Sequence, residues 1–570
     1  MDRNTENHFA YLPETEIGRS KFTRNFTHKT TFNTGDLFVI DWQEILPGDT
    51  VNMDMSSLVR LQTPIAPVLD NLYLDTYWFF VPNRLLWTHW INFMGENTNA
   101  WKQTTSYSVP QLRICSATAT TANRTGVEAG SLANYMGIPI GLGRFGNEPT
   151  KAITVNALPF RAYCKIWNDW FRSTSTQKEL YFPKTDTTES MQSLTTALAQ
   201  TDKYTDYCHS GAICAKANKF HDVFTSALPE PQEGPSTLIP LVGEAPIIWG
   251  QAATSAEGTY SDTTATGTKT LLALNTGTGM DMTGLNDSTS TPEEVYVAAD
   301  KYYKLNVDME NAVGATVNAI RQAFAIQKFY ERTARGGNRY IEQIQSHFNT
   351  TNPDFRLQRS EYLGGATRIP ISINQVVQTV GDSSTPLGNT GAYSVTSDVS
   401  TDMWTHSFTE HGILMCVAVA RTDHTYQQGI AKKFFKKSIF DYYWPELANL
   451  GESPLYLREL YAQDGSSEAI EANETVFGYQ EAWSEYRYEK DIVTGELSSM
   501  YSTPLDIWHY ADYYSTAPTL NEEWIRETDA NVKRTLAVQT GHQFLGDFYI
   551  RGTWTRPMPL YSVPGLVDHH

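Results

Sequence analysis

The chain of 570 residues is too long for one simple hydrophobic core, so it requires several domains or one core with large insertions. Charged residues make up only 19% of it and aromatic residues 12%, which suits a protein with extensive buried contacts. The net charge of −19 argues against simple polycation binding to nucleic acid. Any nucleic-acid contact would therefore need positive charge concentrated on one face, or a separate basic partner.

The cysteine content, the N-terminal segment and the absence of a membrane-length apolar run favour a soluble protein that stays in the cell that makes it. The N-terminal segment has no apolar core of a secretory signal. The apolar run at residues 413–420 is far shorter than the roughly 20 residues of a membrane span. The cysteines are too few and too scattered for a disulfide framework: Cys115, Cys164, Cys208, Cys214 and Cys416.

Residues 18–35 combine cations with phenylalanines and contain no acid. Aromatic and basic side chains in a polar arm suit single-stranded nucleic acid, where bases stack and phosphates pair. The same pattern suits an arm that crosses onto a neighbouring subunit, and both interpretations stay open. The cations are Arg19, Lys21, Arg24 and Lys29.

Alternating side chains predict β-strands at residues 37–42 and 72–80, bounded by turn residues and Pro82. Further strands are expected at residues 368–380, 406–420 and 546–554. Aromatic and apolar residues at helical spacing predict helices at residues 159–170 and from residue 313 onward. Scattered strands with long helix-bearing connections indicate a mainly β fold, either a β-sandwich or a jelly roll.

Two further basic clusters are candidates for phosphate contact. The first follows one side of the helix that opens the block at residues 321–365, and comprises Arg321, Lys328, Arg332 and Arg335. The second is the densest positive charge in the chain, at Lys432, Lys433, Lys436 and Lys437. A solvated helix face explains the second cluster equally well, and its contacts with nucleic acid would be independent of sequence.

Residues 234–306 differ in kind from the rest of the chain. They are rich in Thr, Ser and Gly, and Lys269 is the only cation between residues 251 and 300, against seven acids. A loop of this length inside a compact domain is usually functional or disordered. Its small apolar island, Leu271, Leu272 and Leu274, suggests some packing of its own.

Catalytic and metal-site patterns are weak. Cys208, His209, Cys214 and His221 do not have the spacing of a familiar zinc site. Glutamate pairs such as Glu481 with Glu485, or Glu522 with Glu523, could form a glycosidase couple, but solvated helix charges explain them more simply. We therefore expect no enzyme and no cofactor. A carbohydrate-binding or carbohydrate-active jelly roll is the alternative function.

Long blocks of the sequence, in the same order, resemble the major capsid protein of the microviruses, and in particular their gokushovirus branch. The resemblance covers almost the whole chain and is carried by residues 30–49, 60–87, 158–172, 221–234, 321–365, 407–415, 476–488 and 555–569. It implies an eight-stranded jelly roll with long insertions, sixty copies of which close a T=1 icosahedral shell around circular single-stranded DNA.

The resemblance also implies partners and an exposed insertion. Family members work with an internal scaffolding protein, a DNA pilot protein and a small basic DNA-binding protein, the last of which would resolve the charge deficit. Residues 234–306 stand where gokushoviruses carry an insertion that projects at the threefold axes. We expect this insertion to contact a host bacterial surface receptor, with Leu271, Leu272, Leu274, Asp281 and Asp287 as candidate contacts.

Overall fold

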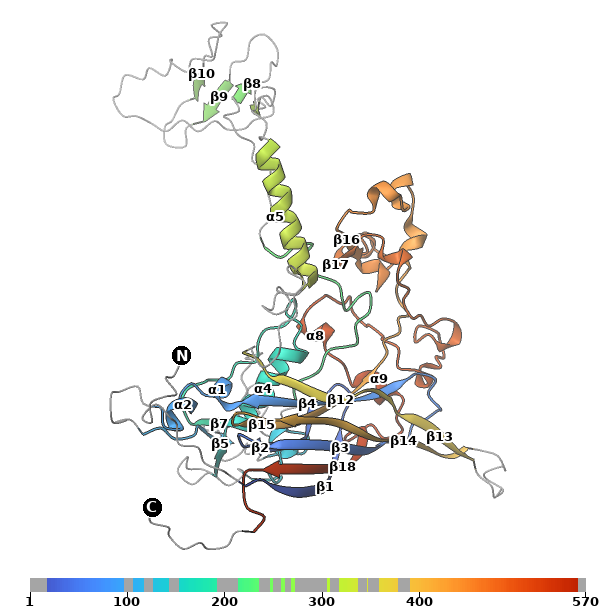
Figure 1. The fold of residues 1–570 in the computed structure, drawn as a ribbon. Coiled ribbons are helices and arrows are strands. Elements are labelled where there is room, and N and C mark those ends of the chain that lie inside the picture. Colours follow the sequence, from blue (N-terminus) through green and yellow to red (C-terminus); the bar gives the residue numbers. More distant parts are fainter. Residues whose placement is uncertain are drawn as a thin grey trace, which may run out of the picture. The chain divides into compact units, whose positions relative to one another are not determined.

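The computed structural model describes residues 18–96, 106–116, 127–142, 153–191, 214–234, 247–249, 258–261, 268–271, 305–307, 317–336, 346, 358–377 and 390–561. The chain divides into two compact units. One comprises Met1–Glu233 and Glu331–His570, and the other comprises Gly234–Tyr330. The first unit contains a β-sandwich of two antiparallel sheets (Figure 1).

The first sheet has five strands, and β1 forms one of its edges. Along its whole length β1 pairs with β18, from Ser20 opposite Arg556 to Phe32 opposite Phe544. The strands in spatial order are β1 (Ser20–Phe32), β18 (Phe544–Arg556), β3 (Thr50–Leu61), β14 (Thr390–Ser407) and β13 (Ser372–Val377).

The second sheet has four strands and is buried through its centre. Strand β15 is a continuous apolar run that pairs with β4 on one side and β2 on the other. Such a run is typical of a strand covered on both faces. The order is β12 (Glu361–Pro370), β4 (Leu72–Pro82), β15 (Gly412–Thr422) and β2 (Phe38–Ile45).

The connectivity is that of a jelly roll. When β1, β2, β3, β4, β12, β14, β15 and β18 are numbered one to eight along the chain, the two sheets run 1-8-3-6 and 5-4-7-2. Strand β13 extends the first sheet as a hairpin with β14. Neighbouring strands far apart in sequence are the signature of two interleaved Greek keys. The predicted mainly β jelly roll is confirmed. The strands expected at residues 37–42, 72–80 and 546–554 fall on β2, β4 and β18, whereas the one expected at 368–380 is divided between β12 and β13 and the one at 406–420 between the end of β14 and β15.

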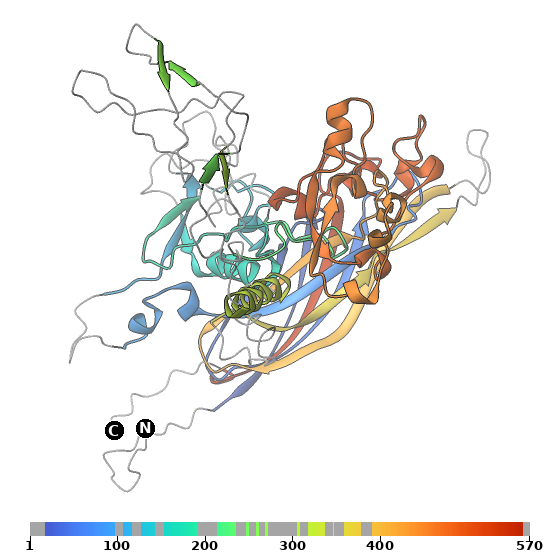
Figure 2. The ribbon, with the colours of Figure 1, turned by 90° about the horizontal axis from the view of Figure 1, so that it is seen from above.

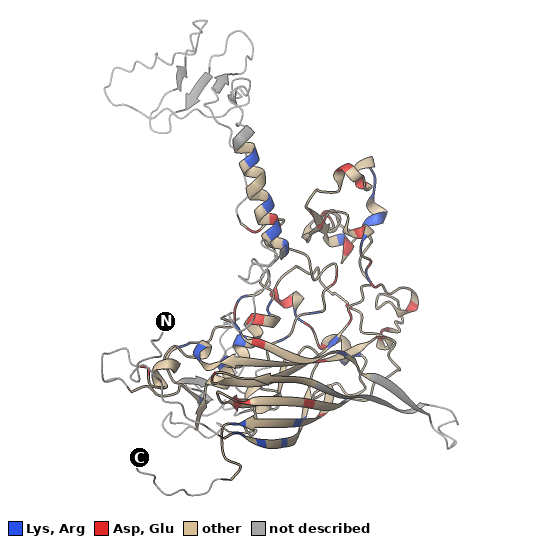
Figure 3. Cartoon of the chain, viewed as in Figure 1, with Lys and Arg blue, Asp and Glu red and all other residues tan. Residues whose placement is uncertain are grey.

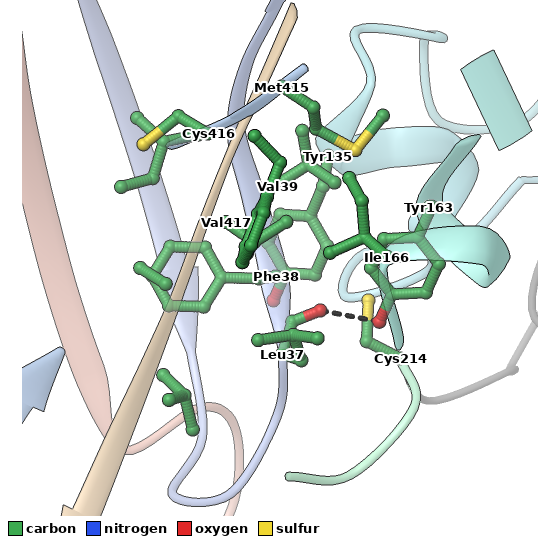
Figure 4. Close-up of a cluster of buried hydrophobic side chains, with 14 of the residues drawn as sticks. Leu37, Phe38, Val39, Tyr135, Tyr163, Ile166, Cys214, Met415, Cys416 and Val417 are labelled. Carbon is green, nitrogen blue, oxygen red and sulfur yellow. Dashed lines mark hydrogen bonds between the residues drawn. The ribbon is translucent and has the colours of Figure 1, made fainter. Parts of the chain in front are cut away.

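Aromatic side chains from both sheets meet in the core. The ring centroids of Phe32 and Phe38 lie 4.1 Å apart, and those of Trp78 and Trp404 lie 5.7 Å apart. The hydroxyl of Tyr163 donates a 2.6 Å hydrogen bond to the carbonyl oxygen of Leu37, which satisfies a polar group inside this core (Figure 4).

Helix α4 (Leu158–Ile166) and the π-helical turn η3 (Trp167–Phe171) cover the outer face of the second sheet. They form the helix expected at residues 159–170. Trp170 packs on Phe79 of β4 with centroids 5.6 Å apart, and Phe171 packs on Tyr77 at 5.3 Å. The aromatic stripe of this helix is therefore core.

The remaining elements of the first unit lie in two long connections, one from β4 to β12 at residues 83–360, which also includes the second unit, and one from β15 to β18 at residues 423–543 (Figure 2). They are α1 (Asn83–Leu86), α2 (Trp90–Phe93), β5 (Gln111–Ser116), α3 (Leu132–Tyr135), β6 (Thr154–Asn156), β7 (Glu189–Met191), η6 (Lys432–Phe435), η7 (Ile439–Asp441), η8 (Pro445–Leu447), β16 (Glu452–Tyr456), η9 (Leu457–Glu459), α7 (Ser467–Ala472), β17 (Val476–Glu481), η10 (Ser484–Tyr486), η11 (Gly495–Leu497), η12 (Asp506–Trp508), α8 (Glu522–Ile525) and α9 (Ala530–Arg534).

The second unit contains short strands and most of helix α5 (Val317–Gly336), whose last residues belong to the first unit. It begins at the same residue as the insertion expected at 234–306 and continues to Tyr330. Its strands are β8 (Ile247–Trp249), β9 (Gly258–Ser261), β10 (Thr268–Leu271) and β11 (Leu305–Val307). Among the described residues of the chain, no helix is long and apolar enough to cross a membrane.

The expectation of a polar arm at residues 18–35 is wrong for residues 20–32. These residues form an edge strand of their own chain's sheet. The physical reason lies in the alternation, because Phe22 and Phe26 fall on the same face of β1 and pack against the core. The spaced aromatics that suggested base stacking are anchors of the sandwich.

Candidate functional site

The two sheets differ in what covers them. Helix α4 and the connections cover the second sheet, whereas the first sheet keeps one face at the surface along β1, β18 and β3. We call this surface the open face. Its side chains are exposed or half-buried and comprise Lys21, Thr23, Asn25, Thr27, Lys29 and Thr31 of β1, Leu545, Asp547, Tyr549, Arg551, Thr553 and Thr555 of β18, and Asn52, Asp54, Ser56, Leu58 and Arg60 of β3.

The open face is locally positive in a chain that is strongly acidic. It carries four cations, Lys21, Lys29, Arg60 and Arg551, against the two acids Asp54 and Asp547, a balance of +2. Arg551 is ion-paired with Asp54, so Lys21 and Arg60 carry the excess charge together with the weakly paired Lys29. Figure 3 shows the basic residues along β1 at this edge of the sheet. Lys29 lies 3.5 Å from Asp547, and both side chains are well exposed, so solvent screens this pair.

The open face also offers hydroxyl groups and one exposed aromatic ring. Tyr549 is at its centre, paired in register with Thr27 on one side and Ser56 on the other. A flat surface of cations, hydroxyls and a ring can contact phosphates and stack on bases without reading their sequence. This chemistry suits a nucleic acid that crosses the face.

The structure separates the four cations expected to act together near the N-terminus. Lys21 and Lys29 point to the open face, whereas Arg24 lies on the inner side of β1. Arg24 donates a 2.7 Å hydrogen bond to the side-chain oxygen of Gln43, and its guanidinium lies 5.0 Å from the ring of Trp554. Arg19 donates to the carbonyl oxygen of Gly48 at 2.6 Å. Arg24 is therefore a structural residue of the sandwich.

The lysines of the tract at 432–437 lie on and just after the single turn η6, with different surroundings. The ammonium of Lys436 lies 3.2 Å from the carboxylate of Glu485, and only 7% of the Lys436 side chain is exposed. Lys433 lies 3.7 Å from Glu489. Lys432 donates a 3.5 Å hydrogen bond to Ser453, and Lys437 is exposed. Lys436 is therefore removed from the expected phosphate contacts, because Glu485 already neutralises its charge.

Of the four cations of α5, three are exposed on the helix and one is bound to neighbouring side chains. Arg321, Lys328 and Arg332 are exposed on the helix. Arg335 pairs with the carboxylate of Glu452 and donates a 2.7 Å hydrogen bond to Gln480. Its side chain therefore ties the end of α5 to the β16–β17 hairpin and is not available as a phosphate contact.

A buried polar network was missed by the sequence analysis. His424 lies between two carboxylates, with Nδ1 3.1 Å from Asp512 and Nε2 3.1 Å from Glu527. Asp512 also binds Lys219 at 3.1 Å and accepts a 2.8 Å hydrogen bond from Tyr514. Nothing in the sequence links these residues, which come from positions 219, 424, 512–514 and 527 of the chain.

The electrostatics of this network favour its charged form. Burial alone would lower the pKa of His424, but Asp512 and Glu527 outweigh it and raise that pKa to about 10. Burial opposes the charge of Asp512 as well, yet Lys219 and His424 hold its pKa well below the usual range. The side chains of His424, Asp512, Glu527 and Lys219 are at most 4% exposed, so no substrate reaches them. The network is structural.

The glutamates considered for glycoside hydrolysis are held by neighbouring cations. Glu481 lies 2.6 Å from Arg487, Glu485 pairs with Lys436, and Glu522 pairs with Arg526 one turn along. Among the described residues, no group of three or more His, Cys, Asp or Glu side chains is arranged to hold a metal ion. Of the weak zinc candidates, Cys214 is buried, and Cys208 and His209 lie outside the described residues.

One of the attachment candidates lies in a described strand. Leu271 ends the short strand β10. Leu272, Leu274, Asp281 and Asp287 lie outside the described residues. Their role in attachment stays a prediction.

Comparison with known proteins agrees with this architecture. The family described as capsid protein (F protein) matches residues 10–566. The chain belongs to this family. The expected membership of the microvirus capsid proteins, gokushovirus branch, is confirmed. The protein is a structural component of a virion, assembles into a shell of many subunits, and is not an enzyme.

Relatives match over nearly their whole length. The chain is 36% identical over 566 residues to capsid protein VP1 of Bdellovibrio phage phiMH2K, which covers 99% of this chain and 98% of that protein. It is 35% identical to capsid protein VP1 of Chlamydia phage 1, covering 98% of each, and 35% identical to capsid protein VP1 of Spiroplasma virus 4, covering 98% and 97%. The sequence similarity to capsid proteins therefore extends across nearly the whole chain.

Proposed function

We propose that sixty copies of this major capsid protein close a T=1 icosahedral shell around a circular single-stranded DNA genome. The observation that supports this most strongly is the jelly roll with one covered sheet and one open face, in a chain that matches capsid proteins from end to end. Shell subunits need two different sides, because one side meets the genome and the other meets solvent.

The open face is the side that meets the genome in this proposal. It gathers positive charge, hydroxyl groups and the ring of Tyr549, although the chain as a whole carries −19. A shell protein meets many stretches of genome, so contacts that do not read sequence are sufficient. Arg321, Lys328, Arg332, Lys432, Lys433 and Lys437 remain candidates for further DNA contacts.

Neutralising the open face tests this assignment. In particles of the variant Lys21→Gln/Lys29→Gln, we expect less packaged DNA, or release of DNA at lower salt than from the unaltered particle. Each lost phosphate contact should reduce the slope of log binding constant against log salt by about 0.7. The matched control is Lys178→Gln/Lys184→Gln, which removes two exposed lysines from the segment after η3. Equal DNA content and equal salt dependence in both variants would refute the assignment.

The net negative charge of the chain favours the participation of a basic partner in packaging the DNA. A small basic DNA-binding protein would neutralise phosphates that the shell leaves unpaired. An internal scaffolding protein and a DNA pilot protein complete the proposed set of partners, and assembly takes place in the cytoplasm of the host bacterium. Co-expression supports this if closed particles form with the scaffolding protein and fail to form without it.

The insertion at residues 234–306 is proposed to form a protrusion at the threefold axes that contacts the host receptor. Its Thr-, Ser- and Gly-rich, acidic composition, separate from the rest of the chain, supports this role. Replacing residues 258–291 with a short linker should leave particles intact but unable to adsorb to host cells. Adsorption at the unaltered rate would remove the role.

A further inference from the structure

The segment around η7 carries large apolar side chains on its outside. We call it the aromatic patch, and it comprises Phe434, Ile439, Phe440, Tyr442, Tyr443, Trp444 and, from η10, Tyr486. Phe434 is 75% exposed and Phe440 is 70% exposed. Exposed side chains of this size, gathered in one stretch, usually mark an interaction site.

Local hydrogen bonds hold the backbone of the patch in one conformation. The carboxylate of Asp441 accepts hydrogen bonds from the backbone N–H groups of Lys437 at 2.8 Å and Ser438 at 2.6 Å. The indole N–H of Trp444 donates to the carbonyl oxygen of Ile439 at 2.9 Å. These bonds fix the backbone of the segment, while the side chains of the patch are exposed.

A second set of contacts fixes the patch to the β16–β17 region. The ammonium of Lys436 lies 3.9 Å from the ring centroid of Tyr486 and 5.4 Å from that of Tyr442, next to its ion pair with Glu485. The indole N–H of Trp483 donates to the carbonyl oxygen of Leu447 at 2.9 Å. These contacts join the two parts of the patch and remove the charge of Lys436 from its surface.

The area and charge of the patch fit a protein partner. Its seven side chains expose roughly 800 Å², taking ordinary areas for large apolar side chains and their exposed fractions. One partner of a standard protein interface buries about 800 Å². Aromatic residues without net charge are also typical of the centre of such an interface. The one cation held against the rings of the patch, Lys436, is already paired with Glu485.

We propose that the aromatic patch is a contact between subunits, covered in the assembled shell by a second copy of this chain. The inference rests on the proposed function, because it requires a shell of identical copies. A second copy is the occupant since the chain belongs to a family whose members pack against themselves and the patch has the area that such a contact needs. The hydrogen bonds described above mean that little ordering is needed when the copy binds.

Site-specific cross-linking in the full-length protein identifies the occupant directly. A photo-reactive phenylalanine analogue in place of Phe440 should, in assembled particles, yield a covalent dimer of this chain. Cross-links only to DNA, only to another viral protein, or to no partner in intact particles would overturn the inference. If the unaltered protein forms no closed particles, the proposed function fails instead, so the two failures are distinguishable.

Substitution within the patch gives an independent test. The variant Phe434→Ser/Phe440→Ser changes two exposed side chains, so we expect the subunit to fold normally but to form at least tenfold fewer closed particles. The control variant Lys178→Gln/Lys184→Gln changes two exposed side chains outside the patch and should assemble at the unaltered yield. Normal particle yield from Phe434→Ser/Phe440→Ser would contradict the inference.

Discussion

The imidazole of His424 lies 3.1 Å from the carboxylate of Asp512, and both side chains are buried. Glu527 lies at the same distance from the other ring nitrogen. Two carboxylates around one imidazole are stable only when the imidazole is protonated. The connection between β15 and β18 therefore has at its centre an ion cluster that depends on pH.

His424 should make the folded subunit sensitive to alkali. Its pKa is raised from the ordinary 6.5 to about 10, so its stabilising contribution is complete below pH 6.5 and is lost as the pH rises through 10. We expect His424→Gln to lower the melting temperature most at pH 6 and least above pH 10. Thermal unfolding from pH 6 to pH 10.5 checks this, and a difference that does not change with pH would contradict it.

Lys219 should be more important for stability than an ordinary lysine. It is buried against Asp512, and its ammonium lies 4.5 Å from the ring centroid of Trp524. Removing one partner of a buried pair leaves an uncompensated charge, so Lys219→Met should cost about 3–5 kcal/mol of unfolding free energy. Lys178→Met, at an exposed lysine, is the control and should change stability by less than about 0.5 kcal/mol. Denaturant titration measures both, and equal effects would refute the role.

The fold could be predicted because its signals are local and repeated. Residues 72–80 alternate and form β4, and the apolar run within 406–420 forms β15. The sequence blocks that resemble the microvirus capsid proteins imply the jelly-roll topology, which alternation alone does not specify. The β1 edge strand was mistaken for an arm because its partner β18 lies more than 500 residues away in the sequence. The network of His424 was missed for the same reason, since Lys219 and Asp512 meet it only through tertiary packing.

The sequence shows which basic residues are candidates for the site, but not which of them are exposed and which are bound to other residues of the protein. Sequence spacing grouped Arg24 with Lys21, and Arg335 with Arg332. Pairing with Gln43 and Glu452 turned Arg24 and Arg335 into structural residues. Which cation faces solvent depends on strand register and on partners from distant segments, and neither is visible in a single sequence.

Arg335 should contribute to stability, whereas Arg332 should not. The side chain of Glu452 is only 7% exposed, and Arg335 satisfies it. Arg335→Leu leaves that carboxylate buried without its cation, at a cost of about 1–3 kcal/mol. Arg332→Leu changes an exposed residue of the same helix and should stay within about 0.5 kcal/mol of the unaltered protein. Chemical unfolding measures the stability of both variants, and an equal loss of unfolding free energy in the two would contradict the structural role of Arg335.

Gly365 should not tolerate a side chain. It lies in the irregular pairing of β12 with β4, at a φ of +157°, and a Cβ there would overlap the carbonyl oxygen of Thr76. Gly365→Ala must therefore displace one strand of the second sheet, and we expect a marked loss of soluble, folded protein. Gly18→Ala has open space around it and is the control. Similar yields and melting temperatures for the two variants would show that the strands move apart without cost.

A reconstruction of the assembled particle by electron cryo-microscopy tests the central claim most directly. The account predicts a closed shell of sixty copies in which Lys21, Lys29 and Tyr549 face the interior, next to the genome. A shell in which the β1–β18–β3 face points outward to solvent, or a protein that remains monomeric in the presence of its scaffolding partner, would contradict it.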